Sequence, residues 1–288
     1  MHDNPPAVSA VTFALPDHHV ISLSGRDAVA FAQAQFMNDV TALATGQWQW
    51  SGWLTAKGRV IALFALLRLD DETVWLLLPD ADAAAMVAAL QRFVFRSKVV
   101  IAARDDLGIS GAFAMPDSAR GAAFSGSGTG LIELDMGADG GPRLLRIGVD
   151  ATGDVALLRR WLAFDLSHGL PRLPASQVEH WTPQQLSLER LGAFSVKKGC
   201  YPGQEIVART HFLGKAKRGI ALLESAEAMP AGANVYGDNA SIGEVVATAS
   251  SGDVCTALAV LPLDRAAQAL VVEGHLVLEQ PLLGGLAR

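Results

Sequence analysis

The sequence Lys197-Lys198-Gly199-Cys200-Tyr201-Pro202-Gly203-Gln204-Glu205-Ile206-Val207-Ala208-Arg209 is the most informative stretch of the chain. Two glycines and a proline within five residues impose a sharp and specific backbone path. Cys200 lies in this turn beside two lysines, whose charges favour the thiolate, the reactive form of a cysteine. On the residues alone two interpretations stay open: a reactive thiol, or a tight turn in which Cys200 is only a small buried residue.

The same stretch begins a positively charged segment on an acidic protein. The chain carries 23 Lys and Arg against 29 Asp and Glu, a net charge of −6. Residues 197–218 hold six basic side chains against Glu205 alone, so this segment is +5 and the remainder of the chain is −11. Such a segment suits a local anionic ligand or partner, with a solvated surface as the alternative. We do not expect direct nucleic-acid contact.

Composition excludes several classes of protein. Half of the 288 residues are apolar and 18% are charged, so a large core can form and wholesale disorder is excluded. The longest uncharged apolar run, Val60 to Leu67, is far shorter than the roughly 20 residues of a membrane-spanning helix. Residues 1–20 do not follow the pattern of a signal peptide, and the only cysteines are Cys200 and Cys255. These features predict a soluble, cytoplasmic protein without a membrane partner.

Metal ligation is not predicted either. Neither cysteine stands in a C-x-x-C pair, and none of the seven histidines belongs to an H-E-x-x-H motif. We therefore expect no metal site.

Apolar periodicity predicts an α+β body. Expected strands lie at 20–24, 48–54, 60–69, 73–78, 98–103, 131–136 and 143–149. Helices are expected at 27–36, from a cap at Asp80 or Asp82 to about Phe93, and at 154–166. Residues 60–69 and 73–78 can pair across a turn at Asp70-Asp71.

The chain changes character after about residue 217. Short apolar segments at 220–223, 233–236, 242–249, 254–261 and 270–278 are separated by Gly, Pro, Asn and Asp. This pattern is typical of a small all-β barrel or sandwich, and it places a linker near 213–218.

The segment K-G-C-Y-x-G-Q-E-x-V-A-R resembles the signature of the YgfZ family, folate-binding proteins built like the glycine cleavage T protein, an aminomethyltransferase. Further stretches agree in order across about residues 20–260: Ser24–Ala28 with Phe31 and Gln35, Ala56–Arg59, Phe95–Val99, Trp161-Leu162, Gly169–Pro171, Pro183-Gln184 and Lys217-Arg218. The resemblance implies a folate-binding body, residues 1–215, and a C-terminal β-barrel, residues 216–288. Within the body it implies two interleaved subdomains, about 1–47 with 111–215, and 48–110.

The function that the resemblance implies is that of a folate-binding accessory protein in iron–sulfur cluster assembly or repair, which supports tRNA modification indirectly. The cofactor would be tetrahydrofolate or a derivative, and the partners would be iron–sulfur assembly or client proteins. By resemblance Cys200 is the catalytic residue. The expected folate-binding residues are Trp161, His18, Lys198, Tyr201, Gln204, Glu205 and Arg209.

Three positions depart from the aminomethyltransferase or YgfZ pattern. Ala62 and Leu63 stand where aminomethyltransferases carry paired aspartates, so we expect no glycine-cleavage activity. Ser167 replaces a glutamate, and His18 replaces a tryptophan that contacts folate in YgfZ relatives. Two other functions stay open: a folate-dependent one-carbon transferase with an unknown acceptor, and an interaction module without folate affinity.

Overall fold

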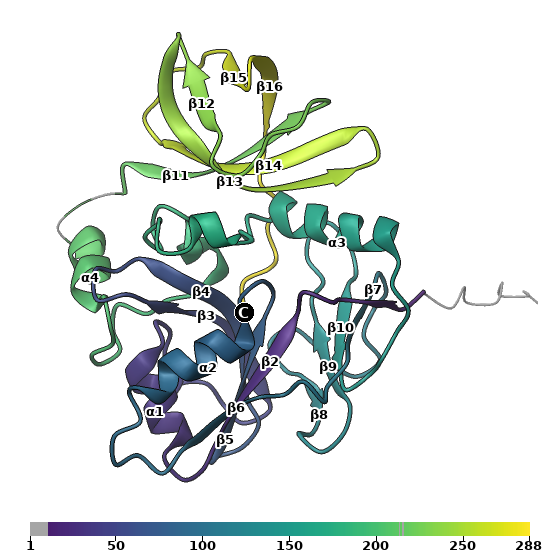
Figure 1. The fold of residues 1–288 in the computed structure, drawn as a ribbon, viewed down its shortest axis with the longest axis vertical. Coiled ribbons are helices and arrows are strands. Elements are labelled where there is room, and N and C mark those ends of the chain that lie inside the picture. Colours follow the sequence, from purple (N-terminus) through teal and green to yellow (C-terminus); the bar gives the residue numbers. More distant parts are fainter. Residues whose placement is uncertain (1–10, 213, 215) are drawn as a thin grey trace, which may run out of the picture.

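The computed structural model describes residues 11–212, 214 and 216–288, which form two five-stranded sheets and a closed six-stranded barrel. The two sheets make up the body and the barrel caps it (Figure 1). All strand pairings within the described ranges are antiparallel. The predicted α+β body with a C-terminal barrel is confirmed.

The first sheet carries the predicted Asp70-Asp71 hairpin. Its strand order is β3 (Gln47–Leu54), β4 (Val60–Arg68), β5 (Thr73–Leu78), β2 (His19–Ser24) and β6 (Val100–Ala103). Helices α1 (Ala28–Gln35) and α2 (Ala83–Gln91) pack on one face, where apolar side chains of the sheet and both helices form a single cluster. Of the two expected caps, Asp82 begins α2, because its carboxylate accepts a hydrogen bond from the Ala85 N–H at 3.0 Å.

The second sheet has the order β1 (Phe13–Ala14), β7 (Ile109–Ala112), β10 (Leu144–Ile147), β9 (Ile132–Asp135) and β8 (Ser125–Gly126). Helix α3 (Val155–Ser167) lies between this sheet and the barrel (Figure 1). Asp154 caps α3 by accepting from the Leu157 N–H at 3.0 Å. The predicted helix over 154–166 is thus confirmed.

Strand pairing groups the N-terminal residues differently from the expected subdomains. We expected residues 1–47 to associate with 111–215, yet only β1 joins the second sheet. Strand β2 pairs with β5 and β6, and α1 packs on the first sheet. The apolar residues Ile21 and Leu23 account for this placement, because both are fully buried against α1 and α2 in the first sheet's cluster.

The barrel closes in the order β11 (Arg218–Ser225), β14 (Val254–Pro262), β13 (Ala240–Ser251), β12 (Asn234–Gly237), β15 (Leu270–Val272) and β16 (His275–Gln280). The single strand expected over 270–278 was wrong: it is the hairpin of β15 and β16. Glu273 and Gly274 both have positive φ, 49° and 83°, as the tight turn of a two-residue hairpin requires.

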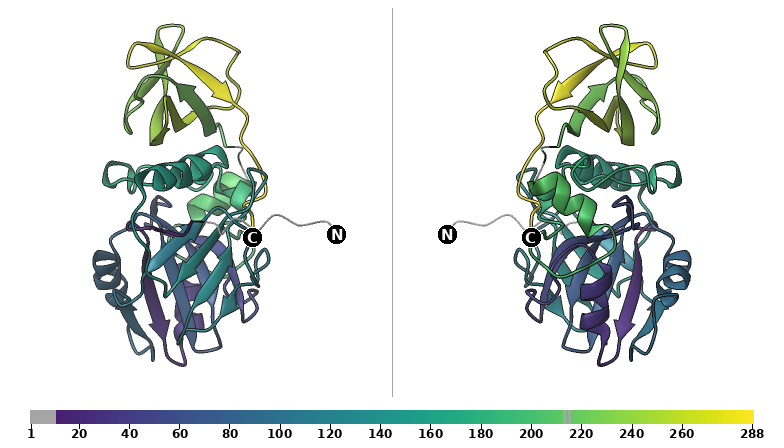
Figure 2. Two further views of the ribbon diagram at one scale, coloured as in Figure 1. Left: turned by 90° about the vertical axis from the view of Figure 1, so that its right-hand side faces the viewer. Right: turned by 90° about the vertical axis from the view of Figure 1, so that its left-hand side faces the viewer.

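Segments beyond the predicted elements join the body to the barrel. They include the helix α4 (Gln204–Phe212) and the 3₁₀ turns η1 (Ala175–Gln177) and η2 (Leu188–Leu191). After β16 the chain leaves the barrel and returns to the body, as both views of Figure 2 show. There the Trp50 indole N–H donates to the Leu286 carbonyl at 2.8 Å. Residues 281–288 thus pack against the body, although we expected them to belong to the barrel.

The length and polarity of the helices decide whether any of them could span a membrane. No helix in the described ranges combines the length and the apolar character that crossing a bilayer demands.

Candidate functional site

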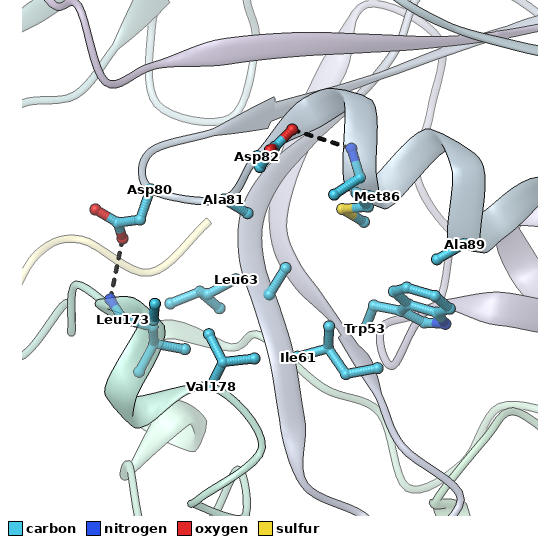
Figure 3. A pocket seen from close by; sticks show the side chains of 13 residues that line it. Trp53, Ile61, Leu63, Asp80, Ala81, Asp82, Met86, Ala89, Leu173 and Val178 are labelled. Carbon is cyan, nitrogen blue, oxygen red and sulfur yellow. Dashed lines mark hydrogen bonds between the residues drawn. The ribbon is translucent and has the colours of Figure 1, made fainter.

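A cavity of about 370 Å³ opens between α2, the start of β4 and the segment 173–178 (Figure 3). We call it the outer cavity. It arises because β4 pairs with β5 only from Ala65 onward, so the first half of β4 has no β5 neighbour. Beyond β5 the chain turns away at Pro79, and α2 covers the resulting gap. A volume of this size lies within the range of small-molecule sites.

The walls of the outer cavity are mostly apolar. Figure 3 shows Asp80 at one end and Trp53 at the other, with Ile61, Leu63 and Met86 between them. Its charged lining residues are Asp80 and Asp82. Ala62 and Leu63, which replace the acids that the resemblance expects, both line this cavity.

A buried ion cluster closes the inner end of the outer cavity. Its members are Asp80, Arg143, Asp165 and Arg172. Arg172 Nε donates to Asp80 Oδ1 at 2.5 Å and Nη1 to Asp165 Oδ2 at 3.1 Å, while Arg143 Nη1 donates to the other Asp165 oxygen at 2.6 Å. Burial raises the pKa of Asp80 and lowers the pKa of Arg143. Two cations and two carboxylates thus neutralise one another inside the protein.

Behind the ion cluster lies a second space of about 10 Å³, which we call the inner cavity. His18 and Trp161 both line it, and their ring centroids are 6.4 Å apart. The structure thus brings together two of the expected folate-binding residues. The space holds about one water molecule.

Trp161 is fully buried, with the Arg143 guanidinium 4.1 Å from its ring centroid and the Phe13 ring at 5.9 Å. In this conformation the indole therefore presents no solvent-facing surface. His18 is also buried, and its Nδ1 has no hydrogen-bond partner among the described residues. Burial, followed by the charges of Arg172 and Arg143, holds the pKa of His18 well below its usual value. The imidazole is therefore neutral at physiological pH.

The remaining expected site residues lie in a different place. They belong to residues 197–203, which we call the Cys200 loop, and to α4. Cys200 is exposed and forms no disulfide bond. Glu205 and Arg209 on α4 are exposed as well. Neither cavity is lined by any described residue of 197–209. The expected set of site residues is thus divided between the inner cavity and this surface.

Lys198 anchors the Cys200 loop from within. Its side chain is buried, and Nζ donates to the carbonyl oxygens of Gln33, Phe36 and Asn38 at 2.5, 2.5 and 3.0 Å. Burial lowers the pKa of Lys198 to about 8. We expected this ammonium to favour the neighbouring thiolate, but its protons are directed at carbonyls in the last turn of α1 and just after it. These carbonyls lie about 160 residues away in the sequence, so the motif around Cys200 could not predict them.

Tyr201 and Gln204 complete the anchoring on the other side of Cys200. The buried Tyr201 hydroxyl donates to the Ser195 carbonyl at 3.2 Å, and burial raises its pKa to about 12. Gln204 Nε2 donates to the Lys198 carbonyl at 3.1 Å. Buried residues therefore flank an exposed cysteine, which presents the thiol to solvent on a fixed backbone.

The Cys200 loop also packs against the turn that precedes β4. Gly203 has a φ of +79°, and a Cβ there would lie 2.6 Å from both the Gly58 Cα and the Thr55 carbonyl oxygen. Gly58, with a φ of +69°, would place a Cβ 2.8 Å from the Ile206 Cβ. Only glycine fits both positions, so two motifs distant in the sequence meet here by backbone contact.

Two further observations concern Cys255 and the possible metal ligands. Cys255 is buried in the barrel cluster, with its sulfur 3.2 Å from the Thr248 hydroxyl oxygen, so it packs as expected. Across the described ranges, no three His, Cys, Asp or Glu side chains gather closely enough to hold a metal ion.

Comparison with known proteins bears on the fold. No protein-family model matches the chain. Among solved structures, the glycine cleavage system aminomethyltransferase T from Bartonella henselae is similar, with a TM-score of 0.72 and 16% sequence identity. The match covers 96% of this chain and 85% of that one. The chain therefore has an aminomethyltransferase-like fold.

Proposed function

We propose that the protein binds tetrahydrofolate or a derivative and acts as an accessory protein in iron–sulfur cluster assembly or repair, in the manner of the YgfZ family. The observation that carries the folate proposal is the outer cavity. It lies in an aminomethyltransferase-like fold and is lined by Ala62 and Leu63, at the positions where the resemblance expects the acids of aminomethyltransferases.

The cavity chemistry supports a flat, partly apolar ligand. Ile61, Leu63 and Met86 supply aliphatic and thioether surface, and Trp53 supplies an aromatic one. Such walls suit the ring system of a folate, with a few polar groups to fix its orientation. His18 and Trp161 would support the inner end of the site, behind the ion cluster.

Glycine-cleavage chemistry is not part of the proposal. Alkyl side chains at Ala62 and Leu63 can neither accept a proton nor orient an amine. The alternative function, one-carbon transfer to an unknown acceptor, would also need a base. Asp80 is held by Arg172 and by the Leu173 N–H, which donates to it at 3.1 Å. Burial raises the pKa of Asp80, but both of its oxygens already accept a hydrogen bond from a fixed donor, so the carboxylate is better placed for binding than for proton transfer and we favour the accessory role.

The second part of the proposal concerns Cys200. Its exposure on an anchored loop suits a partner that meets the protein at its surface, such as an iron–sulfur assembly or client protein. Support of tRNA modification would then be indirect, through cluster-dependent enzymes, and would take place in the cytoplasm. A net charge of −6 agrees with the absence of RNA contact from this scheme.

Calorimetric titration with tetrahydrofolate tests the folate proposal, with two variants of α2 as matched probes. Ala85 lines the outer cavity, whereas the adjacent Ala84 is exposed and does not. Ala85→Trp should fill the cavity and weaken binding at least about tenfold, a loss of about 1.4 kcal/mol. Ala84→Trp should bind like the wild type. Equal loss in both variants, or no binding by the wild type, would refute the placement.

A further inference from the structure

Polar groups are scarce in the outer cavity, and this makes its two carboxylates informative. Asp82 is committed to the helix, since it accepts the Ala85 N–H at the start of α2. Asp80 comes from a different element, the chain that leaves β5, and stands at the opposite side from Trp53 (Figure 3). About a fifth of its side chain, 21%, remains exposed.

The position of the Asp80 carboxylate is fixed by its neighbours. Oδ1 accepts from Arg172 Nε, and Oδ2 accepts from the Leu173 N–H. Arg172 is itself held by Asp165 at 3.1 Å, so the guanidinium cannot swing away without breaking the ion cluster. An ionised carboxylate offers about four acceptor sites, and these two donors leave one on each oxygen.

We infer that Asp80 is the residue that determines ring specificity in the outer cavity, by accepting the paired N–H donors of the ligand's aminopyrimidinone edge. This inference rests on the proposed folate function. The edge of a pterin presents an amino group beside a ring N–H, two parallel donors of the kind that a carboxylate binds in a bidentate manner. The apolar side chains of the cavity, including those of Ala62 and Leu63, carry no hydrogen-bond acceptor.

Asp80 thereby differs from the aspartates that the resemblance expects on β4, at the positions of Ala62 and Leu63. It reaches the cavity from the end of β5, and Arg172 and Leu173 orient it rigidly. A preoriented acceptor suits recognition, because little ordering accompanies binding. Hydrogen bonds to a charged group contribute roughly 10- to 100-fold in affinity.

The test compares two ligands on three proteins by calorimetry. The ligands are tetrahydrofolate and its 2-desamino-2-methyl analogue, which lacks the amino donor. The wild type should prefer tetrahydrofolate by roughly 10- to 100-fold. Asp80→Asn should lose most of this preference, because an amide offers one acceptor oxygen and places a donor against the ligand. Asp82→Asn, a change in the same cavity wall, should keep the preference.

The ratio between the ligands separates recognition from stability. A variant that is merely less stable weakens both ligands alike, and the wild-type comparison needs no variant at all. Equal affinity of the wild type for the two ligands, or full preference in a folded Asp80→Asn protein, overturns the assignment of Asp80 while leaving folate binding intact. Failure of the wild type to bind either ligand overturns the proposed folate function and the inference with it.

Discussion

The walls of the outer cavity come from four separate stretches, at residues 53, 61–63, 80–89 and 173–178. The Cys200 loop is held by hydrogen bonds within residues 195–204 and by those of Lys198 to the carbonyls of residues 33–38. The cavity has a polar end whose charges neutralise one another in the interior. The loop has a buried anchor on each side and an exposed thiol between them. Binding and thiol chemistry thus have separate structural supports, and mutations should affect them separately.

The largest expected effect lies on the Cys200 loop. Cys200→Ser should abolish the support of cluster-dependent enzymes in a strain that lacks the protein, since a serine hydroxyl is a far weaker nucleophile and metal ligand than a thiolate. Stability and tetrahydrofolate affinity should stay near wild type, because the residue is exposed and lies outside the outer cavity. Cys255→Ser is the control and should retain function. Full complementation by Cys200→Ser would show that the loop is only a structural turn.

In the ion cluster beside the outer cavity, by contrast, a substitution should lower the stability of the protein. Arg172→Met leaves the carboxylates of Asp80 and Asp165 without this cation, and breaking a buried pair destabilises by about 3–5 kcal/mol. Denaturant unfolding measures this loss. Arg104→Met removes a solvent-exposed pair with Asp106 and should change stability by about 1 kcal/mol or less. Similar losses in both variants would mean that the ion cluster does not hold the cavity together.

Lys198 provides a sharper probe of the loop, with its neighbour as a matched control. Lys198→Met removes the donor to three backbone carbonyls, and stability should fall by about 2–3 kcal/mol. Lys197 is exposed, so Lys197→Met should change stability by less than about 0.5 kcal/mol. Unfolding curves give both values, and amide hydrogen exchange over 195–204 should rise only in Lys198→Met. Unchanged exchange in that variant would contradict the anchoring role.

The smallest effect concerns pH and the inner cavity. Because the folded-state pKa of His18 is lowered, the unfolded chain binds a proton below pH 6.5 that the folded chain does not. Stability should therefore be complete above pH 6.5 and fall by about 1.4 kcal/mol per pH unit below it. His18→Phe should remove this slope, leaving that of His168, whose pKa burial also lowers. Parallel pH profiles of unfolding free energy would show that His18 is protonated in the folded protein.

Local patterns predicted much of the fold. Alternation and turn residues located β4, β5 and the hairpin between them. Asp154 marked the start of α3, and the start of α2 was narrowed to Asp80 or Asp82. The short apolar segments predicted a small all-β barrel or sandwich, and the structure has the barrel. One hairpin was predicted as a single strand, because Glu273 gives little sign in the sequence that it adopts positive φ. Helix α4 was not predicted, because it begins directly after two glycines and a proline, residues that are typical of turns.

The candidate site was less predictable for a different physical reason. Resemblance placed both Trp161 and His18 at the folate site, but the guanidinium of Arg143 lies over that indole only because the residue just before β10 packs against α3 in the folded chain. Asp80 looked like one of two possible helix caps, and only the folded chain places it in a cavity beside Arg172. Lys198 was expected to favour the Cys200 thiolate and to bind folate, whereas in the folded chain it donates to carbonyls at the end of α1. Tertiary partners, not local propensity, decide these roles.

The contact between Gly58 and Gly203 restricts which substitutions evolution or protein engineering can introduce at these two positions. A methyl group at either position collides with the opposing segment, so a substitution at one glycine requires a change in the segment that contacts it. A graft of residues 197–209 into another scaffold would need that scaffold to carry a glycine in the turn before its fourth strand. The two segments are therefore one transferable unit, and a chimera that exchanges only the cysteine-bearing half should misassemble even though every reactive group has been copied.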